Sequence, residues 1–297
     1  MSMHTRRRFL AHSAAALAAA FLSRKLRAGT EVSGSALSSL LSALEERCAG
    51  RLGVAVLDPQ TGEWLGWRED ERFAMCSTFK LLLAASILQR VDRGLERTDR
   101  SILVPPKPLL VTSPVTEQHA GERMPVGALC EAIVTRSDNT AANLLLETVG
   151  GPDAVTRFAR SIGDEVTRLD RPELALNEAT PGDPRDTTTP RAMARNLETL
   201  LVKDLLAPAS REQLIAWMVE SRSGIAKLRS ALPAGWRAGD KTGANGSTTS
   251  NDIAIAWRPD GRPLLIAAYL TECPGPEAKR ASVLAETGRL VFSAKRA

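Results

Sequence analysis

The sequence is poor in histidine. Two of its three histidines, His4 and His12, lie close to the N-terminus, which leaves His119 alone in the rest of the chain. A hydrolytic zinc site usually takes two or three histidines. The composition therefore argues against a zinc hydrolase, and against a Ser-His-Asp triad unless His119 is the base. We expect neither a metal nor another cofactor.

Cysteine is also scarce. Four cysteines in 297 residues are too few for a disulfide scaffold; they are Cys48, Cys76, Cys130 and Cys273. An oxidising compartment would permit pairing. Buried thiols that act as small hydrophobic side chains are the alternative.

The overall composition is that of a globular protein. Hydrophobic residues make up 43% and charged residues 25% of the chain, as in a protein of one large domain or two interleaved ones. The net charge of +5 is uneven: residues 1–28 hold six basic side chains and no acidic one, which leaves 33 basic against 34 acidic side chains. The remainder of the chain therefore gives no reason to expect a nucleic-acid partner.

Residues 1–28 predict an export signal. Arginines at 6–8 precede an apolar Ala/Leu run that is too short to span a bilayer. The arginine run followed by Phe9 resembles a twin-arginine signal. A signal anchor retained in the mature protein is the alternative. Cleavage near Ala28 would leave a periplasmic or secreted protein without membrane contact.

Strand-like segments lie at both ends of the remaining chain. Leucines at helical spacing over residues 35–48 precede two β-like runs, and further β-like runs with an Asp260-Gly261 turn come before a closing helix near 276–294. The residues between are mostly helical in pattern, and one helix starts with Thr189 as N-cap and Pro190 in its first position.

This order predicts an α/β fold of the α+β type. We expect a mainly antiparallel sheet, flanked by helices and built from both chain ends, with an all-helical domain inserted into it. The sheet domain would comprise residues 29–76 and 234–297. The helical domain would comprise residues 77–233, including an irregular loop at 168–186.

Three short motifs carry the chemistry. Ser77 precedes Lys80 by three residues at the start of an apolar helix, which puts an ammonium beside a hydroxyl that needs a proton acceptor. Each motif taken singly has a simple structural interpretation. The first would be a capped helix, Ser137 in Ser137-Asp138-Asn139 would be a helix cap, and Lys241-Thr242-Gly243 would be the end of a strand. Together, in this order, they match the motif set of class A β-lactamases and penicillin-binding proteins.

From about residue 35 to its end, the chain resembles a class A serine β-lactamase. Other matching stretches are 113–119, 228–236 and 251–257. The resemblance implies an α/β domain and an all-helical domain with the active site in the cleft between them. It also implies that Ser77 is the nucleophile, that Lys80 and Ser137 relay its proton, and that backbone N–H groups of Ser77 and Ala244, after Gly243, hold the oxyanion. Substrate would contact Asn139, Lys241 and Thr242.

The loop at 171–186 contains Glu173 and Asn177. Pro181, Gly182 and Pro184 break any helix there. By resemblance, Glu173 is the base that activates the deacylating water, and Asn177 is the second holder of that water. Whether Lys80 or Glu173 is the acylation base stays open. Arg171 and Asp186 match the ion pair that clamps this loop; an accidental Glu-x-x-x-Asn pattern is the alternative.

Several positions depart from the commonest family pattern. Thr112 stands where many members have an aromatic residue at the cleft rim, and Ser250 where many have an arginine for the substrate carboxylate. We hypothesise that Lys227 supplies this cation instead; an ordinary exposed lysine is the alternative.

The cysteines depart from the family pattern as well. The family disulfide partners of Cys76 and Cys130 are replaced by Asn245 and Ala84, so neither of these two bridges can form.

The predicted function is hydrolysis of penicillins and cephalosporins, small-molecule β-lactams, by a monomeric enzyme. A DD-peptidase or penicillin-binding protein shares the three motifs, and only the Glu173/Asn177 loop argues against it. A sensor domain that is acylated once is a second alternative. The only tyrosine, Tyr269, lies in a predicted strand, which disfavours a class C-type mechanism.

Overall fold

The computed structural model describes residues 34–295, so the export-signal prediction for residues 1–28 lies outside the described part. Among the helices of residues 34–295, none combines the length and the apolar character that crossing a bilayer requires.

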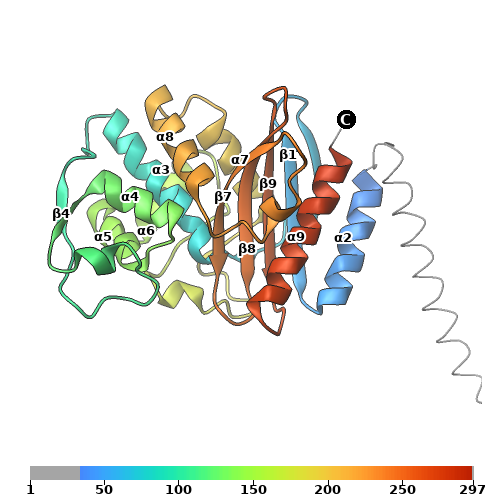
Figure 1. Cartoon of the computed structure of the whole chain (residues 1–297), viewed down its shortest axis with the longest axis horizontal. Coiled ribbons are helices and arrows are strands. Elements are labelled where there is room, and N and C mark those ends of the chain that lie inside the picture. Colours follow the sequence, from blue (N-terminus) through green and yellow to red (C-terminus); the bar gives the residue numbers. More distant parts are fainter. Residues whose placement is uncertain (1–33, 296–297) are drawn as a thin grey trace, which may run out of the picture.

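One five-stranded antiparallel sheet with the strand order β2-β1-β9-β8-β7 forms the central layer (Figure 1). Its strands are β1 (Arg51–Asp58), β2 (Glu63–Trp67), β7 (Arg237–Ala244), β8 (Ser250–Trp257) and β9 (Pro263–Thr271). Because β1 pairs with β9, the two ends of the chain meet inside the sheet. This confirms the predicted antiparallel sheet built from both chain ends.

The sheet is buried on both faces. Side chains alternate along β1: Val54 and Val56 join the core on one face, while Ala55 and Leu57 join the core on the other. The first face is covered by α2 (Gly34–Cys48) and α9 (Glu277–Ala294), which lie side by side (Figure 1). The regular leucine spacing of α2 is therefore the pattern of a helix with one buried stripe.

The remaining helices lie on the second face of the sheet and beyond β7 (Figure 1). They are α3 (Phe79–Asp92), α4 (Val126–Thr135), α5 (Asn139–Val149), α6 (Asp153–Ser161), α7 (Pro190–Leu201) and α8 (Pro208–Glu220). Helix α7 packs against β1 and β9, and α8 packs against β7. As predicted, the Thr189 side chain caps α7 by accepting a hydrogen bond from the Ala192 amide at 3.1 Å. The division into two domains stays a prediction.

Short elements connect this framework. Two small antiparallel pairs join β3 (Phe73–Ala74) to β6 (Thr187–Thr188) and β4 (Ser101–Leu103) to β5 (Arg123–Pro125). Single 3-10 turns are η1 (Cys76–Thr78), η2 (Thr116–His119), η3 (Ala175–Asn177) and η4 (Leu228–Ala231). The β3–β6 pair joins the segment before Ser77 to the end of the 168–186 loop.

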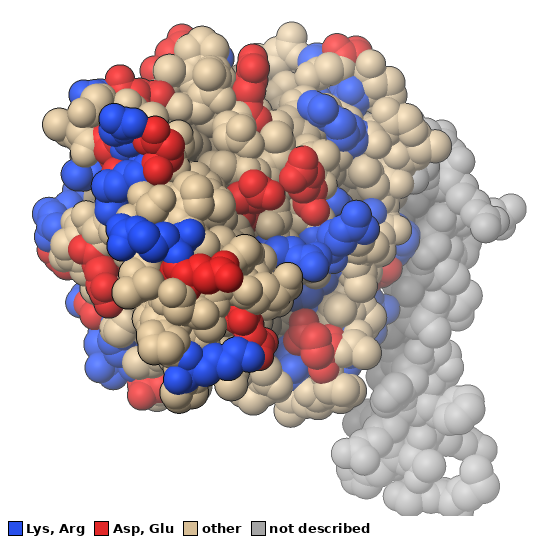
Figure 2. All heavy atoms as spheres, turned by 60° about the vertical axis from the view of Figure 1, so that its left-hand side comes forward, with Lys and Arg blue, Asp and Glu red and all other residues tan. Residues whose placement is uncertain are grey.

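The surface and the cysteines agree with the composition. On the face that Figure 2 shows, Lys and Arg side chains are interspersed with Asp and Glu side chains. All four cysteines are buried and form no disulfide in the structure. The Cys48 and Cys273 thiols also donate hydrogen bonds to the carbonyl oxygens of Glu45 and Cys48.

Candidate active site

The nucleophile candidate Ser77 lies in η1, directly before α3, and the end of β7 lies against it. A side chain on Gly243 could not fit, because its Cβ would be 2.6 Å from the Met75 carbonyl oxygen and 3.0 Å from the Ser77 nitrogen. The glycine of the Lys-Thr-Gly motif therefore lets β7 approach the backbone of Ser77. Two motifs far apart in the sequence meet here.

The Lys80 ammonium is fully buried and lies within 2.9 Å of three oxygens. Its Nζ is 2.8 Å from the Ser137 carbonyl oxygen, 2.6 Å from Asn139 Oδ1 and 2.9 Å from Glu173 Oε1. Burial lowers the pKa of Lys80, and the Glu173 carboxylate opposes this shift. The second motif and the loop thus converge on the lysine of the first.

Ser137 connects the two buried lysines. Its backbone is left-handed, with φ of 57°, and its Oγ accepts a hydrogen bond from Lys241 Nζ at 3.1 Å. Lys80 Nζ is 3.5 Å from the same Oγ. Burial and the nearby charge of Lys80 lower the pKa of Lys241 to about 7.

The middle residue of the second motif has a structural role that the sequence analysis did not assign. Asp138, not Ser137, caps α5: its Oδ1 accepts from the Ala141 amide at 2.9 Å. The same carboxylate accepts from the Thr116 hydroxyl at 2.8 Å and from the Val115 and Thr116 amides, each at 2.9 Å. Fully buried, Asp138 fixes the 113–119 segment at the side of the site.

The loop brings Glu173 to the nucleophile. Glu173 Oε1 accepts a hydrogen bond from Ser77 Oγ at 3.3 Å, and its Oε2 accepts one from Asn177 Nδ2 at 2.6 Å. The Glu173 side chain is buried. Asn177 Oδ1 is also buried, and it has no hydrogen-bond partner within residues 34–295.

A residue missed by the sequence analysis holds the backbone of Glu173. Asn143 Oδ1 accepts from the Glu173 amide at 2.9 Å, and Asn143 Nδ2 donates to the Glu173 carbonyl at 2.8 Å. Asn143 lies one helical turn after Asn139, on the same side of α5. The only indication of this role in the sequence is the spacing of four residues between the Asn139 and Asn143 side-chain amides, which puts both on one face of a helix.

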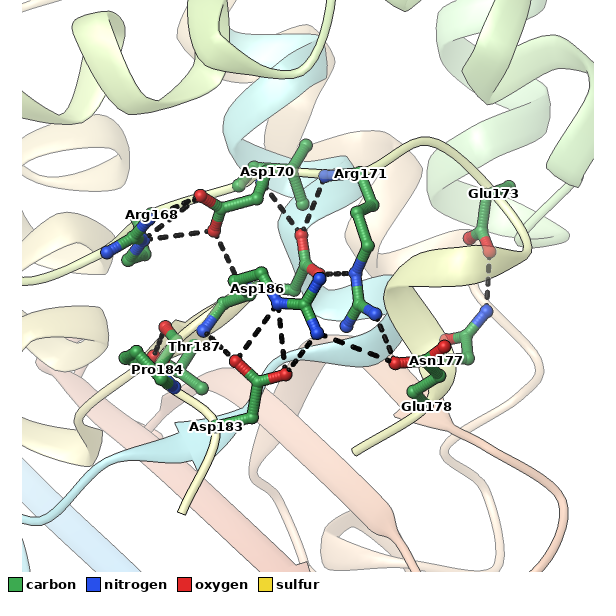
Figure 3. A network of polar contacts seen from close by, with 12 residues as sticks. Arg168, Asp170, Arg171, Glu173, Asn177, Glu178, Asp183, Pro184, Asp186 and Thr187 are labelled. Carbon is green, nitrogen blue, oxygen red and sulfur yellow. Dashed lines mark hydrogen bonds and ion pairs between the residues drawn. The ribbon is translucent and has the colours of Figure 1, made fainter. Parts of the chain in front are cut away.

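The base of the loop is closed by reciprocal bonds (Figure 3). Arg171 Nε is 2.6 Å from Asp186 Oδ2, and Asp186 Oδ1 accepts from the amides of Asp170 at 2.7 Å and Arg171 at 3.0 Å. In return, Asp170 Oδ2 accepts from the Asp186 amide at 3.0 Å. Arg171 also pairs with Glu178. The structure thus brings Arg171 and Asp186 together.

Lys227 lies beside the end of the Lys-Thr-Gly strand. Its Nζ is 2.8 Å from Ser250 Oγ and 3.1 Å from Glu277 Oε1, and Ser250 pairs with Ala244 across β7 and β8. Lys227 is only 6% exposed, so the alternative of an ordinary exposed lysine is wrong. Its pairing with Glu277 had no signal in the sequence.

Together these groups suit nucleophilic acyl transfer. A hydroxyl, a carboxylate and two buried amines lie in one hydrogen-bonded group around Ser77. Thr242 is anchored next to them by its hydroxyl, which donates to Ser223 Oγ at 2.7 Å. Within residues 34–295, no cluster of His, Cys, Asp and Glu side chains is arranged to hold a metal ion.

The chain is similar to known proteins over nearly its whole length. A family model described as the β-lactamase enzyme family matches residues 36–294. β-Lactamase L2 of Stenotrophomonas maltophilia is 46% identical over 97% of this chain and 98% of that protein. β-Lactamase OXY-2 of Klebsiella oxytoca is 42% identical over 96% and 97% of the two chains.

Solved structures give the same result. A class A β-lactamase of the last common ancestor of Gram-negative bacteria is 58% identical, with a TM-score of 0.86 over 88% of this chain and 99% of that one. A β-lactamase from Xanthomonas campestris pv. campestris is 48% identical, with a TM-score of 0.85, and the match covers 88% of this chain and 98% of that one. The fold, the motifs and these relatives agree: the chain belongs to the β-lactamase enzyme family, in class A.

Proposed function

We propose that the chain hydrolyses β-lactam antibiotics through an acyl-enzyme on Ser77, and so confers resistance to them. The observation that carries this proposal is the 3.3 Å distance between Ser77 Oγ and Glu173 Oε1. Hydrolysis of an acyl-enzyme needs a base close to the ester. A penicillin-binding protein is inhibited by its long-lived β-lactam adduct, and a sensor is acylated once, so neither needs a carboxylate at that point to hydrolyse the adduct.

Acylation opens the strained ring. Ser77 Oγ attacks the lactam carbonyl carbon, the carbon–nitrogen bond breaks, and the ring nitrogen takes a proton through Ser137. The Ser77 proton can go directly to Glu173, which already accepts a hydrogen bond from Ser77 Oγ. For Lys80 to be the acceptor instead, it must first become a neutral amine by giving its own proton to Glu173, its ion-pair partner at 2.9 Å. The amide hydrogens of Ser77 and Ala244 stabilise the negative oxygen that develops on the carbonyl.

Deacylation uses Glu173 and Asn177. Glu173 takes a proton from a water, the resulting hydroxide attacks the ester carbon, and the serine leaves with a proton to give a substituted β-amino acid. The support is the pair of oxygens available to hold that water: Glu173 Oε1 and the unpaired Asn177 Oδ1 within the described chain. The Arg171–Asp186 pair holds the loop in the closed position that this geometry requires.

Substrate binding is assigned to the groups around the end of β7. Asn139, Lys241 and Thr242 contact the substrate, and Gly243 keeps that strand end close to Ser77. Lys227 binds the substrate carboxylate from the second side. We further propose that a twin-arginine signal at residues 1–28 directs export to the periplasm or the medium, and that the enzyme is a monomer.

The first test uses Glu173→Gln. We expect the wild-type protein to turn over an excess of a chromogenic cephalosporin with little covalent adduct. The variant keeps the shape of the side chain and loses its basicity, so it should open about one ring per molecule and retain the adduct on Ser77. Intact-mass measurement gives both results; sustained hydrolysis by the variant, or a persistent adduct on the wild type, would refute the proposal.

A second test follows from the pKa of Lys241. With its pKa at about 7, Lys241 is charged below that pH and loses its charge as the pH rises. We expect kcat/KM for a penicillin, which carries a carboxylate, to fall on the alkaline side of about pH 7. Lys241→Arg keeps a cation at every accessible pH, so its alkaline decline should move to higher pH. An alkaline decline at the same pH in both enzymes would contradict the role of Lys241.

A third test concerns Lys227→Ala. Removing a cation that binds the substrate carboxylate should raise KM for penicillins by about 10-fold, as a charged hydrogen bond contributes about 1.5 kcal/mol or more. The matched control is Lys203→Ala, because Lys203 also pairs with a glutamate, Glu198, but lies outside the site. An unchanged KM for Lys227→Ala would remove Lys227 from the substrate-binding groups.

A further inference from the structure

The turn that presents Ser77 has an unfavourable backbone. Cys76, directly before the nucleophile, has φ of 43°, in the left-handed region that residues other than glycine rarely adopt. Such a conformation persists only where its surroundings hold it. The contacts of residues 73–78 therefore decide where the Ser77 hydroxyl and amide lie.

Four residues in register across the sheet receive this turn. Gly53 of β1 pairs with Tyr269 of β9, Tyr269 with Asn251 of β8, and Asn251 with Gly243 of β7. We call these four residues the cross-sheet row. The two glycines at its ends provide room: a side chain on Gly53 would overlap the Phe73 ring, and one on Gly243 would meet the Met75 carbonyl.

The two inner residues of the cross-sheet row provide hydrogen bonds. Asn251 Nδ2 donates to the carbonyl oxygens of Ala74 at 2.9 Å and Met75 at 3.0 Å. Asn251 is fully buried, and its Oδ1 has no partner in the described part of the chain, so its amide group serves these two carbonyls.

Tyr269 contacts Thr78, the residue directly after the nucleophile. The Thr78 hydroxyl donates to the Met75 carbonyl at 2.9 Å, so the Tyr269 hydroxyl, 3.2 Å from Thr78 Oγ1, is the donor in that contact. Met75 thus receives hydrogen bonds from both sides of Ser77, through Asn251 and through Thr78. On the opposite side, the Met75 amide donates to the Asp186 carbonyl at 2.9 Å, which connects the same turn to the Glu173 loop.

We propose that Asn251 is a positioning residue for acylation, and that Tyr269 assists it. Asn251 fixes the Met75 carbonyl against Gly243, and this sets the distance between the Ser77 amide and the end of β7. Both oxyanion donors assigned above lie at this junction. The inference rests on the proposed function only in its acylation step, which a hydrolase and a penicillin-binding protein share.

The experiment measures the acylation rate constant of Asn251→Ala by rapid-quench mass spectrometry. Loss of the two hydrogen bonds frees the turn, and an error of about 1 Å in a reacting group can cost about 100-fold in rate. We expect acylation to slow by about 10-fold or more, with a much smaller change in the apparent affinity for the intact substrate. Tyr269→Phe, which removes one hydroxyl, should give a smaller decrease in the same rate constant.

The matched control is Asn196→Ala. Asn196 is 2% exposed in α7, and its Nδ2 donates to Asp164 Oδ2 at 2.6 Å, away from the Ser77 turn. Both alanine variants lose a buried amide and should unfold at lower temperature than the wild type. Only Asn251→Ala should also slow acylation at a temperature where each variant is folded.

The outcomes separate the inference from the proposed function. Folded Asn251→Ala that acylates at the wild-type rate, or Asn196→Ala that is slowed equally, would overturn the positioning role. If Asn251→Ala does not fold, Tyr269→Phe decides, and an unchanged rate there overturns the inference. A wild-type protein that acylates without turnover would refute hydrolysis and leave the role of Asn251 intact.

Discussion

The burial of one ammonium group determines how the site is assembled. Lys80 is fully removed from water, and an unpaired charge in such a place would be very costly. Its three closest oxygen partners come from the turn before α5, from α5 itself and from the Glu173 loop. The lysine therefore couples α3 to two separate segments, and each of these segments carries groups assigned to catalysis.

The loop around Glu173 shows how an irregular segment can be held with little secondary structure. One asparagine, Asn143, satisfies the amide and the carbonyl of Glu173, while Asp170 and Asp186 exchange bonds with each other's backbone at the loop base. These bonds take the place of the regular backbone hydrogen bonds of a strand or helix, so the loop can hold the buried Glu173 carboxylate in a fixed position. Figure 3 shows that this charged base and the Glu173–Asn177 pair occupy opposite parts of the same loop.

Much of this arrangement could be predicted from the sequence. Hydrophobic periodicity predicted the helices and strands, and the order of the elements predicted a sheet made from both ends of the chain. The three motifs and the loop identified five candidate site residues: Ser77, Lys80, Ser137, Glu173 and Lys241. In the structure, their side chains form one connected hydrogen-bonded group.

The remainder depends on partners that are distant in sequence. Asn143 and Asp138 bond to backbone groups, which every residue possesses, so no residue type marks the partner in the sequence. The Lys227–Glu277 pair likewise depends on how η4 lies against α9. A left-handed φ at Cys76 has no sequence signature either, because glycine is absent there.

The pairing of the two chain ends has a consequence for the biosynthesis of this protein. The cross-sheet row beneath Ser77 takes Gly53 from the first strand and Tyr269 from the last. A nascent chain that already contains Ser77, Lys80 and Glu173 still lacks β7, β8 and β9, the three strands that supply Gly243, Asn251 and Tyr269 to the nucleophile's turn. Contacts between such distant segments form late and slowly. The turn that carries Ser77 therefore gains all four residues of the cross-sheet row only after β9 has been synthesised and has paired with β1.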